Sequence, residues 1–331
     1  MINDIQNSLI KKESIFGPDN YKPLPVVLSK AKGVWAWDVN EKKYLDMMSG
    51  YSAVSHGHAH PELLRVFHEQ SSRLSLTSRA FYTDTLGPYL ETITKMSGFE
   101  MCLPMNSGAE AVETAIKSSR RWAYRTKKVK PGKAEIIVAD GNFHGRTTTI
   151  ISFSTDENSR EDFGPHTPGF VAVKYGCSES IESAINENTA AVLIEPIQGE
   201  AGIVVPPENY LPEVRDICTK HNVLMILDEI QSGLGRTGKL FAYQHSNIQP
   251  DGLILGKALG GGFMPVSCFL SSEEVLHWMN PGSHGSTFGG NPLAAAIAKR
   301  SLELLEEDGL IENSRVMGQY FKESLLNMNS K

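Results

Sequence analysis

The sequence predicts an α/β fold in which helices cover a mostly parallel central sheet. Two patterns in the chain of 331 residues indicate this fold. Apolar runs of strand length recur along the chain, and helical stretches separate several of them. This alternation is typical of parallel strands that are connected through helices and covered by them. The predicted strands are residues 135–139, 149–153, 190–194, 223–227 and 252–255.

The remaining elements follow from local signals. Gly33–Met48 has the pattern of a hairpin, which we assign to a separate small domain. Ser107 is a natural N-cap, and the composition from Ala109 to about Trp122 is helical. Two more helical stretches, Leu293–Glu307 and Ile311–Asn327, follow the last predicted strand. We therefore expect a large sheet domain between the hairpin and these last helices.

Composition and charge exclude several classes of protein. Hydrophobic residues make up 40% of the chain and charged residues 21%, and the net charge of −6 argues against a nucleic-acid partner. No apolar run approaches membrane-spanning length, and the polar N-terminus lacks the apolar core of an export signal. The cysteines are widely spaced without a C-x-x-C pair, so they indicate neither zinc nor disulfides; they are Cys102, Cys177, Cys218 and Cys268. We expect a cytoplasmic protein without a membrane partner.

Lys257 is the strongest candidate for a reactive side chain. It follows the apolar run 253–256 and precedes the glycine-rich segment 258–262, where a lysine has little structural purpose. Burial disfavours the ammonium form, so a lysine at the end of a buried strand tends toward the neutral amine that forms a Schiff base with carbonyl groups. A surface lysine on a loop is the alternative.

A carboxylate stands in the equivalent position on another predicted strand. Asp228 ends the apolar run 223–227, and the connection from there to Lys257 is long enough for one crossover. Both side chains can then meet at the edge of the sheet where α/β proteins bind their ligands. A buried amine and a buried carboxylate together suit pyridoxal phosphate, which needs the amine for a Schiff base and the carboxylate for its pyridinium nitrogen.

The segment Pro104–Glu113 supplies a candidate phosphate site. Backbone N–H groups near Gly108 and Ala109 would be unpaired donors at the positive end of the helix that Ser107 caps. An ordinary capped helix fits this segment equally well. Its co-occurrence with the candidate amine and carboxylate favours the phosphate site.

A glycine-rich segment indicates a different chemistry. Gly233–Gly238 has the glycine spacing of dinucleotide-binding loops, but residues 239–244 lack the capping signal of the helix that should follow. The same span meets most of a P-loop, except that Leu240 stands where a magnesium-binding hydroxyl is required. A nucleotide enzyme is therefore the weaker interpretation.

Alternating histidines form the best metal candidate. His56, His58 and His60 would project from one face of a strand and could bind a divalent ion. Pro61 and the residues after it, however, have the pattern of a first helical turn, which makes the segment a loop. We predict no metal site here.

Nearly the whole chain resembles the class-III aminotransferases, a family of fold-type-I pyridoxal phosphate enzymes. The similar segments are Asn20–Val26, Tyr51–Val54, Thr77–Tyr82, Asn142–Thr147, Glu195–Gly202, Asp228–Gln231, Gly256–Leu259 and His284–Pro292. Several of them are shared by members that act on acetylornithine or 4-aminobutyrate. Tyr21, Tyr51 and Ser78–Tyr82 favour the members that act on ornithine. The resemblance implies a large and a small domain.

For the cofactor, the resemblance implies that Lys257 forms the Schiff base and moves the proton, and that Asp228 pairs with the pyridinium nitrogen. Gln231 would bind the phenolic oxygen, and Phe143 would stack on the ring. Thr287 would reach the phosphate of a neighbouring subunit, so a homodimer is expected. The implied cofactor-binding residues are Ser107, Gly108, Ala109, Phe143, His144, Asp228, Gln231, Lys257 and Thr287.

For the substrates, the resemblance implies L-ornithine and 2-oxoglutarate. The δ-amino group would pass to 2-oxoglutarate, giving glutamate semialdehyde and glutamate. Tyr21 and Arg146 would hold the α-amino and α-carboxylate groups of ornithine, because arginine clamps carboxylates with two parallel hydrogen bonds. Tyr51 would line the same pocket, and Glu200 would pair with an arginine from the C-terminal small domain.

The family's arginine segment is not found before Lys331, so we expect a small domain that is incomplete at the C-terminus and a weakened activity. The implied domains are residues 1–60, which contribute to the small domain, residues 61–309, which bind the cofactor, and residues 310–331, which begin the C-terminal small domain. Two alternatives stay open. The substrate could be acetylornithine or another ω-amino acid, or the chain could bind the cofactor without being active.

Overall fold

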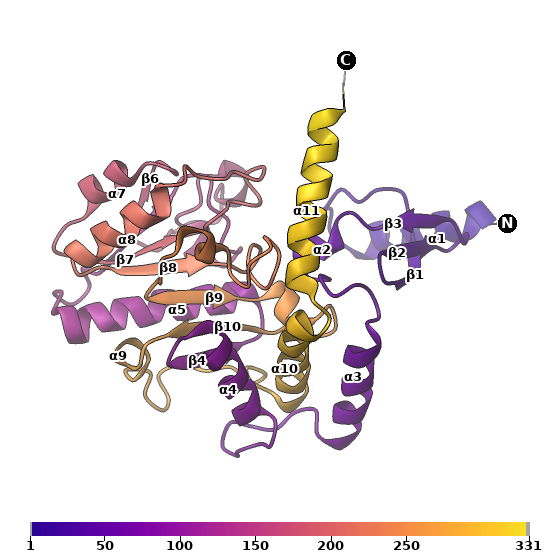
Figure 1. Cartoon of the computed structure of the whole chain (residues 1–331), viewed down its shortest axis with the longest axis horizontal. Coiled ribbons are helices and arrows are strands. Elements are labelled where there is room, and N and C mark those ends of the chain that lie inside the picture. The colour runs from indigo at the N-terminus through magenta and orange to yellow at the C-terminus, as the bar shows by residue number, and fades with distance from the viewer. Residues whose placement is uncertain (1, 329–331) are drawn as a thin grey trace.

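The computed structural model describes residues 2–328 and confirms the predicted α/β class. Its centre is a seven-stranded sheet with the order β4-β10-β9-β8-β7-β5-β6 (Figure 1). Strand β10 runs antiparallel to both of its neighbours, and the other pairs are parallel. The strands are β4 (Met101–Met105), β5 (Glu135–Ala139), β6 (Phe170–Val173), β7 (Thr189–Ile194), β8 (Leu224–Asp228), β9 (Gly252–Leu255) and β10 (Ser267–Ser271).

Helices cover both faces of this sheet. The inner strands β7, β8 and β9 are therefore buried along their whole length. One core cluster joins a face of the sheet to α4 (Leu86–Ser97), α7 (Ser178–Ala184), α8 (Tyr210–Lys220) and α10 (Pro292–Glu307). A second cluster joins the other face to α5 (Gly108–Trp122), α6 (Thr148–Ile151) and α9 (Glu273–Leu276). Neighbouring residues of β5 alternate between the clusters: Ile137 belongs to the first and Ile136 to the second.

Most predicted elements are confirmed, and one strand is wrong. Strands are present at four of the five predicted places, and the predicted helices correspond to α5, α10 and α11 (Leu310–Asn327). Residues 149–153 instead overlap α6, because the Thr147 side chain accepts a hydrogen bond from the Ile150 N–H and caps a helical turn. A short apolar run is buried equally well in either conformation, so its composition could not separate the two.

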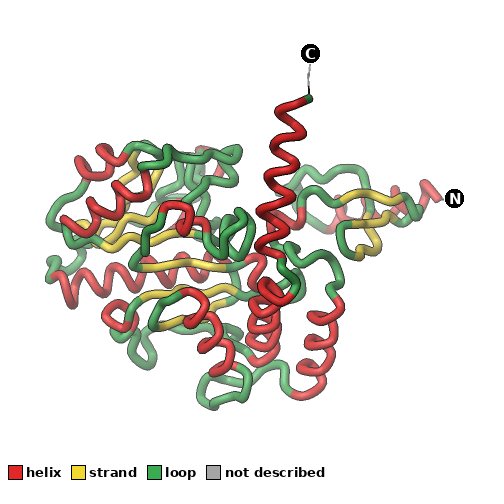
Figure 2. Tube along the Cα trace, viewed as in Figure 1, coloured by secondary structure: helices red, strands yellow, loops and turns green. Residues whose placement is uncertain are grey.

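A separate three-stranded antiparallel sheet follows the N-terminal helix α1 (Ile2–Phe16). It contains β1 (Leu28–Lys32), β2 (Trp35–Asp38) and β3 (Lys43–Leu45), and Figure 2 shows it apart from the large sheet. The buried Asp38 carboxylate shapes the predicted β2–β3 turn by accepting hydrogen bonds from the N–H groups of Asn40 and Lys42 and the hydroxyl of Tyr44, at 2.8 to 3.0 Å. The hairpin prediction is confirmed.

The two last helices differ in their surroundings. Helix α10 packs against α4 and against α3 (Pro61–Arg73), which follows the single turn α2 (Ser49–Ser52). Helix α11 begins after Gly309 and extends away from the large sheet (Figure 1). It has no buried residue, and its exposed apolar side chains are Val316, Met317, Tyr320, Phe321, Leu325 and Leu326. Within residues 2–328, no helix has the length and apolarity that a membrane crossing requires.

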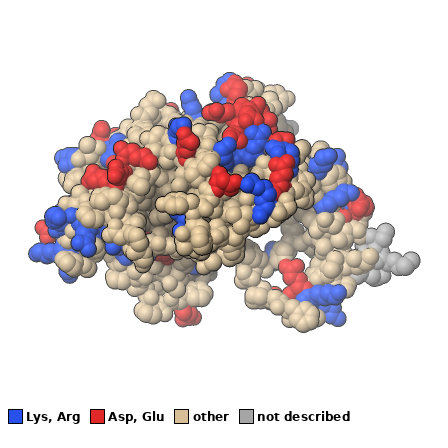
Figure 3. Space-filling model, turned by 90° about the horizontal axis from the view of Figure 1, so that it is seen from below, with Lys and Arg blue, Asp and Glu red and all other residues tan. Residues whose placement is uncertain are grey.

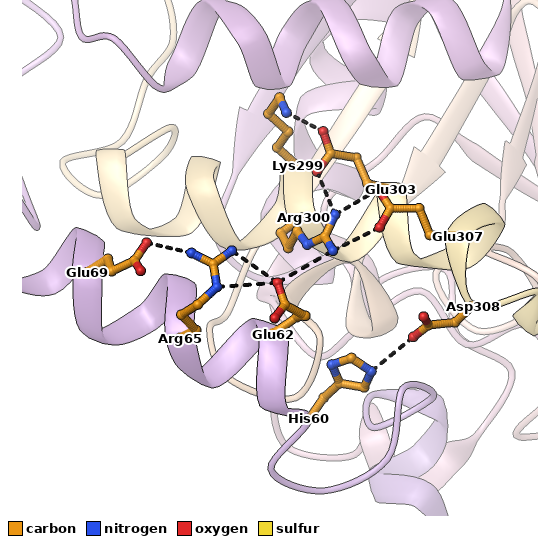
Figure 4. Close-up of polar contacts among 9 residues, drawn as sticks. All are labelled: His60, Glu62, Arg65, Glu69, Lys299, Arg300, Glu303, Glu307 and Asp308. Carbon is orange, nitrogen blue, oxygen red and sulfur yellow. Dashed lines mark hydrogen bonds and ion pairs between the residues drawn. The ribbon is translucent and has the colours of Figure 1, made fainter.

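Charged side chains connect α3 to α10 (Figure 4). The Arg300 guanidinium donates to both carboxylate oxygens of Glu307, at 2.8 and 2.9 Å, and lies 3.5 Å from the Glu62 carboxylate of α3. Arg65 also pairs with Glu62, so this carboxylate is shared by two arginines. Figure 3 shows acidic and basic side chains next to one another on the face of the molecule seen from below. Arg300 is therefore the cation at the centre of the α3–α10 contact.

Replacing Arg300 by methionine should lower the free energy of unfolding by about 1–2 kcal/mol, because a two-pronged ion pair is lost at a side chain that is 19% exposed. Urea denaturation measures this loss. Arg315→Met is the matched control, since Arg315 pairs with Glu312 on the exposed helix α11 and should contribute less than about 0.5 kcal/mol. An equal loss of unfolding free energy in the two variants would contradict a stabilising role for the ion pairs of Arg300.

Candidate active site

Four neighbouring strands end at one cavity of about 200 Å³. His144 lies in the loop after β5, Glu195 directly follows β7, Asp228 ends β8, and Lys257 comes two residues after β9. Since β5, β7, β8 and β9 are parallel, their carboxyl ends face the same edge of the sheet. The sheet thus brings an imidazole, two carboxylates and an amine together from distant parts of the sequence.

Lys257 lines this cavity at the start of a short helical turn, Lys257–Gly260. Its backbone φ of 44° lies in the left-handed region, which is unusual for a residue other than glycine. Burial lowers the pKa of Lys257, although the charges of Asp228, Glu200 and Glu195 oppose this effect. The local structure therefore favours the neutral amine more than water would.

Asp228 and His144 form a buried pair. The Asp228 side chain is 4% exposed, and its Oδ2 lies 2.7 Å from Nδ1 of His144. Burial would lower the pKa of His144, but the hydrogen bond and charge of Asp228 outweigh it, and the pKa is raised. The contact with Asp228 thus favours the charged form of the imidazole more than burial disfavours it. Oδ1 of Asp228 accepts from the Ile230 N–H at 3.0 Å, which orients the carboxylate further.

The N-terminus of α5 forms another wall of the cavity. Ser107 caps the helix, and a capping box links it to Glu110. The Ser107 hydroxyl and carbonyl accept from the N–H groups of Glu110 and Ala111, which leaves the N–H groups of Gly108 and Ala109 without a protein acceptor among the described residues. Both of these residues line the cavity. This end of the helix is suited to an anion.

Gln231 and Glu200 meet at the opening of the site. The Gln231 amide donates to Oε1 of Glu200 at 3.0 Å, and both side chains line the cavity. The contact requires a glycine at position 199, because an added Cβ there would lie 1.3 Å from the amide oxygen of Gln231. The backbone at Gly199 thus defines where the Gln231 side chain can lie.

Phe143 and Arg146 connect the cavity to a second one. The Arg146 guanidinium lies 5.4 Å from the centre of the Phe143 ring, in a cation–π contact. A neighbouring cavity of about 350 Å³ is lined by both residues and by Glu200. Arg146 is itself exposed, so its charge is available to a ligand at this opening.

Four predicted site residues do not line either cavity of this chain. The Ser107 hydroxyl is engaged in the helix cap, and Thr287 is exposed in a loop. Tyr21 and Tyr51 lie in the N-terminal part of the chain and are 74% and 54% exposed. All four are assigned to the site by the family resemblance, and their contacts with cofactor or substrate stay predictions.

Sequence reasoning did not select Glu195, although it lines the cavity. The signal that identified Asp228 was also present at Glu195: each is an acidic residue that directly follows a predicted buried strand. Glu229, next to Asp228, is also buried, but its carboxylate accepts from the N–H groups of Ala242 and Tyr243 at 2.7 and 2.8 Å. Burial raises the pKa of Glu229 to about 8. Glu229 therefore fixes a loop and does not face the cavity.

The alternating histidines and the glycine-rich segment do not form the metal or nucleotide sites that were considered for them. His56, His58 and His60 contact the Ser301 carbonyl, Asp46 and Asp308, respectively, and the described residues contain no cluster of side chains that could hold a metal ion. Gly233–Gly238 forms turns, and no α-helix opens directly after it. The helix N-terminus that a dinucleotide or P-loop site requires is missing there.

Comparisons with known proteins identify the family. The profile described as aminotransferase class-III matches residues 16–331. The ornithine aminotransferase of Brevibacillus brevis is 52% identical over 324 residues, which are 98% of this chain and 81% of that protein. The chain therefore belongs to the class-III aminotransferases, which are pyridoxal phosphate-dependent enzymes.

Solved structures agree with this assignment. The ornithine aminotransferase of Toxoplasma gondii, described with partial occupancy of pyridoxal phosphate, superposes with a TM-score of 0.96 at 42% identity, covering 97% of this chain and 75% of that one. The acetylornithine aminotransferase of Elizabethkingia anophelis gives a TM-score of 0.87 at 45% identity, covering 97% of this chain and 78% of that one.

The residues at the cavity fit this cofactor. Pyridoxal phosphate requires an amine, a carboxylate for its ring nitrogen and donors for its phosphate. Lys257, Asp228 and the free N–H groups of α5 supply these three groups within one cavity. Gly108 also keeps the cradle open, because a Cβ there would lie 2.9 Å from Cδ1 of Ile230.

Replacing Gly199 by alanine should lower the affinity for pyridoxal phosphate about tenfold, because the new methyl group expels the Gln231 amide from its position and one hydrogen-bonding group is lost. Fluorescence titration of the cofactor-free chain measures the dissociation constant. Gly87→Ala is the control, since no atom lies within 4 Å of its added Cβ. An unchanged affinity in Gly199→Ala would contradict a role for Gln231 at the cofactor.

Proposed function

We propose that this chain transfers the δ-amino group of L-ornithine to 2-oxoglutarate, giving glutamate semialdehyde and glutamate. The observation that carries the proposal is the single cavity in which Lys257 faces the Asp228–His144 pair and the N-terminus of α5. The choice of ornithine is supported by relatives named ornithine aminotransferase, which are 52–54% identical to the chain over 94–98% of its length.

Lys257 and Asp228 do the central work in this proposal. The bound cofactor supplies an aldehyde that condenses with amines and a pyridine ring that accepts electrons. Lys257 presents the amine that holds the aldehyde and then carries a proton at its Nζ, a task for which a lowered pKa is suited. Asp228 keeps the ring nitrogen protonated, and His144 stabilises the charge of Asp228.

The other cofactor contacts are assigned by position. Phe143 packs on the ring, Gln231 binds the phenolic oxygen, and the N–H groups of Gly108 and Ala109 bind the phosphate. Ser107 would complete the phosphate site from the same helix end. Thr287 is exposed in this chain, which is compatible with a contact to the phosphate of a second copy. We therefore propose a homodimer as the working form.

Substrate selection is assigned to the outer part of the site. Arg146 clamps the α-carboxylate of ornithine, and the Tyr21 hydroxyl oxygen accepts a hydrogen bond from its α-ammonium group. The δ-amino end then points toward Lys257. Tyr51 lines the same region. Glu200 lines both cavities, and we assign it to pair with an arginine of the C-terminal small domain.

The organisation of the chain completes the proposal. We propose residues 61–309 as the cofactor-binding domain, with residues 1–60 and the segment from 310 contributing to a small domain; residue 1 and residues 329–331 lie outside the described part. A separate N-terminal sheet and the projecting helix α11 support these limits. The four cysteines are unpaired, which suits the cytoplasm.

The visible absorption spectrum of the purified chain with pyridoxal phosphate tests the proposed chemistry. We expect an absorption band that changes when L-ornithine is added and returns when 2-oxoglutarate follows. Lys257→Ala should bind the cofactor without showing this band. If the band forms but does not respond to ornithine, the ornithine assignment fails, and the chain is a cofactor-binding form without this activity.

Tyr21→Phe separates ornithine from acetylornithine, which is favoured as a second candidate by the 45% identical neighbour structure. Loss of a hydrogen bond to a charged α-amino group should raise the KM for L-ornithine about tenfold. The KM for N-acetylornithine should change less than about twofold, because its α-amino group is uncharged. Tyr320→Phe on α11 is the control. An unchanged KM for ornithine would contradict this assignment.

A further inference from the structure

Glu195 lines the cavity but has no role in the chemistry described above. It follows β7 directly, between the strands that supply His144 and Asp228. Its side chain is 6% exposed and lines the same cavity as Lys257. A buried carboxylate costs free energy unless it is paired or hydrogen-bonded, so its partners indicate what it does.

The side chain of Glu195 holds the backbone of Phe143. Its Oε2 accepts a hydrogen bond from the Phe143 N–H at 3.1 Å. Phe143 belongs to the loop that follows β5, and no hydrogen bond within a strand fixes it there. The carboxylate of Glu195 thus sets the position of the residue whose ring lines the cavity.

The backbone of Glu195 is itself fixed. The Tyr175 hydroxyl donates to the carbonyl oxygens of Glu195 and Pro196, at 3.0 Å each. Tyr175 packs edge-on against Tyr210, with the ring centres 5.4 Å apart. These contacts hold the backbone at the end of β7 beside the cavity.

Charged groups face Glu195 from each neighbouring element. His144 follows β5, Asp228 ends β8, and Lys257 follows β9, while Glu200 lies further along the segment after β7. Burial raises the pKa of Glu195 to about 7, with the charge of His144 opposing and that of Asp228 adding to the effect. Near neutral pH this carboxylate is therefore only partly ionised.

We propose that Glu195 is a positioning residue of the cofactor site, which anchors Phe143 through its side-chain oxygen and controls the protonation of Lys257 through its charge. The proposal rests on the function assigned to Lys257. It differs from the role of Glu229, whose carboxylate is consumed by two backbone N–H groups outside the cavity. The backbone N–H groups of Phe143 and Gly199 also lie beside the Glu195 carboxylate, but Glu195, unlike Glu229, lines the cavity that contains Lys257.

Two substitutions separate the two effects. Glu195→Gln keeps an oxygen for the Phe143 N–H and removes the charge, whereas Glu195→Ala removes both. We expect the dissociation constant for pyridoxal phosphate to stay within about threefold of wild type in Glu195→Gln and to rise about tenfold in Glu195→Ala. Glu187→Gln, an exposed change just before β7, is the matched control. Thermal denaturation shows whether each variant is folded.

The charge effect is measured at Lys257. The cofactor-free full chain is labelled with acetic anhydride at a series of pH values, and modification of Lys257 is quantified by mass spectrometry. Negative charge raises the pKa of Lys257, so removing it in Glu195→Gln should move the labelling midpoint to lower pH. The midpoint of Glu187→Gln should equal that of wild type. A purely structural Glu195 would leave the midpoint of Glu195→Gln unchanged.

Either of two results would overturn the proposal. One is a labelling midpoint in Glu195→Gln that matches wild type, and the other is equal cofactor affinity in Glu195→Ala and Glu195→Gln. Failure of the proposed function would look different, since the wild-type chain would then form no visible band that depends on Lys257. The labelling experiment needs no cofactor. It therefore tests the effect of the Glu195 charge on Lys257 even if the proposed function fails.

Discussion

The buried pair of Asp228 and His144 is the interaction on which the site depends. A carboxylate inside a protein normally takes up a proton, because the charged form loses its hydration. Here the imidazole of His144 lies 2.7 Å away, and its contact with Asp228 raises the pKa of His144 despite its burial. The role that we propose for Asp228 at the ring nitrogen of the cofactor therefore involves His144, which is enclosed with it.

The parallel sheet makes that pairing possible. His144 and Asp228 are far apart in the sequence, and the strands before them are separated in the sheet by β7 alone. Glu195, at the end of β7, therefore must lie between them. Each carboxylate added to this edge raises the pKa of a neighbouring amine, whereas burial lowers it. At Lys257 burial is the larger effect and lowers the pKa, while the charges of Asp228, Glu200 and Glu195 oppose it.

Residues at the ends of buried strands were predictable from the sequence, and contacts made by loops were not. Lys257 and Asp228 stand after apolar runs, so their position at the sheet edge follows from strand direction. Glu195 carries the same signal, but nothing in a linear sequence shows that its carboxylate reaches the Phe143 N–H. The error at residues 149–153 has a related cause, because one threonine cap decides between strand and helix. Tyr21 and Tyr51 reached the prediction through the family resemblance, since no local pattern relates their exposed positions to the cavity.

The contact between Gln231 and Glu200 links the cofactor end of the site to its opening. The amide of Gln231 donates to Glu200, so a phenolic oxygen at the proposed cofactor position would share this group with the carboxylate. An amide has two N–H groups, and both acceptors can be satisfied together if the side chain stays where the backbone of Gly199 confines it. Under that condition the Gln231 amide also keeps the Glu200 carboxylate in place at the cavity. The position of the Gln231 side chain, and with it the contact to Glu200, is then limited by Gly199, a residue that has no side chain.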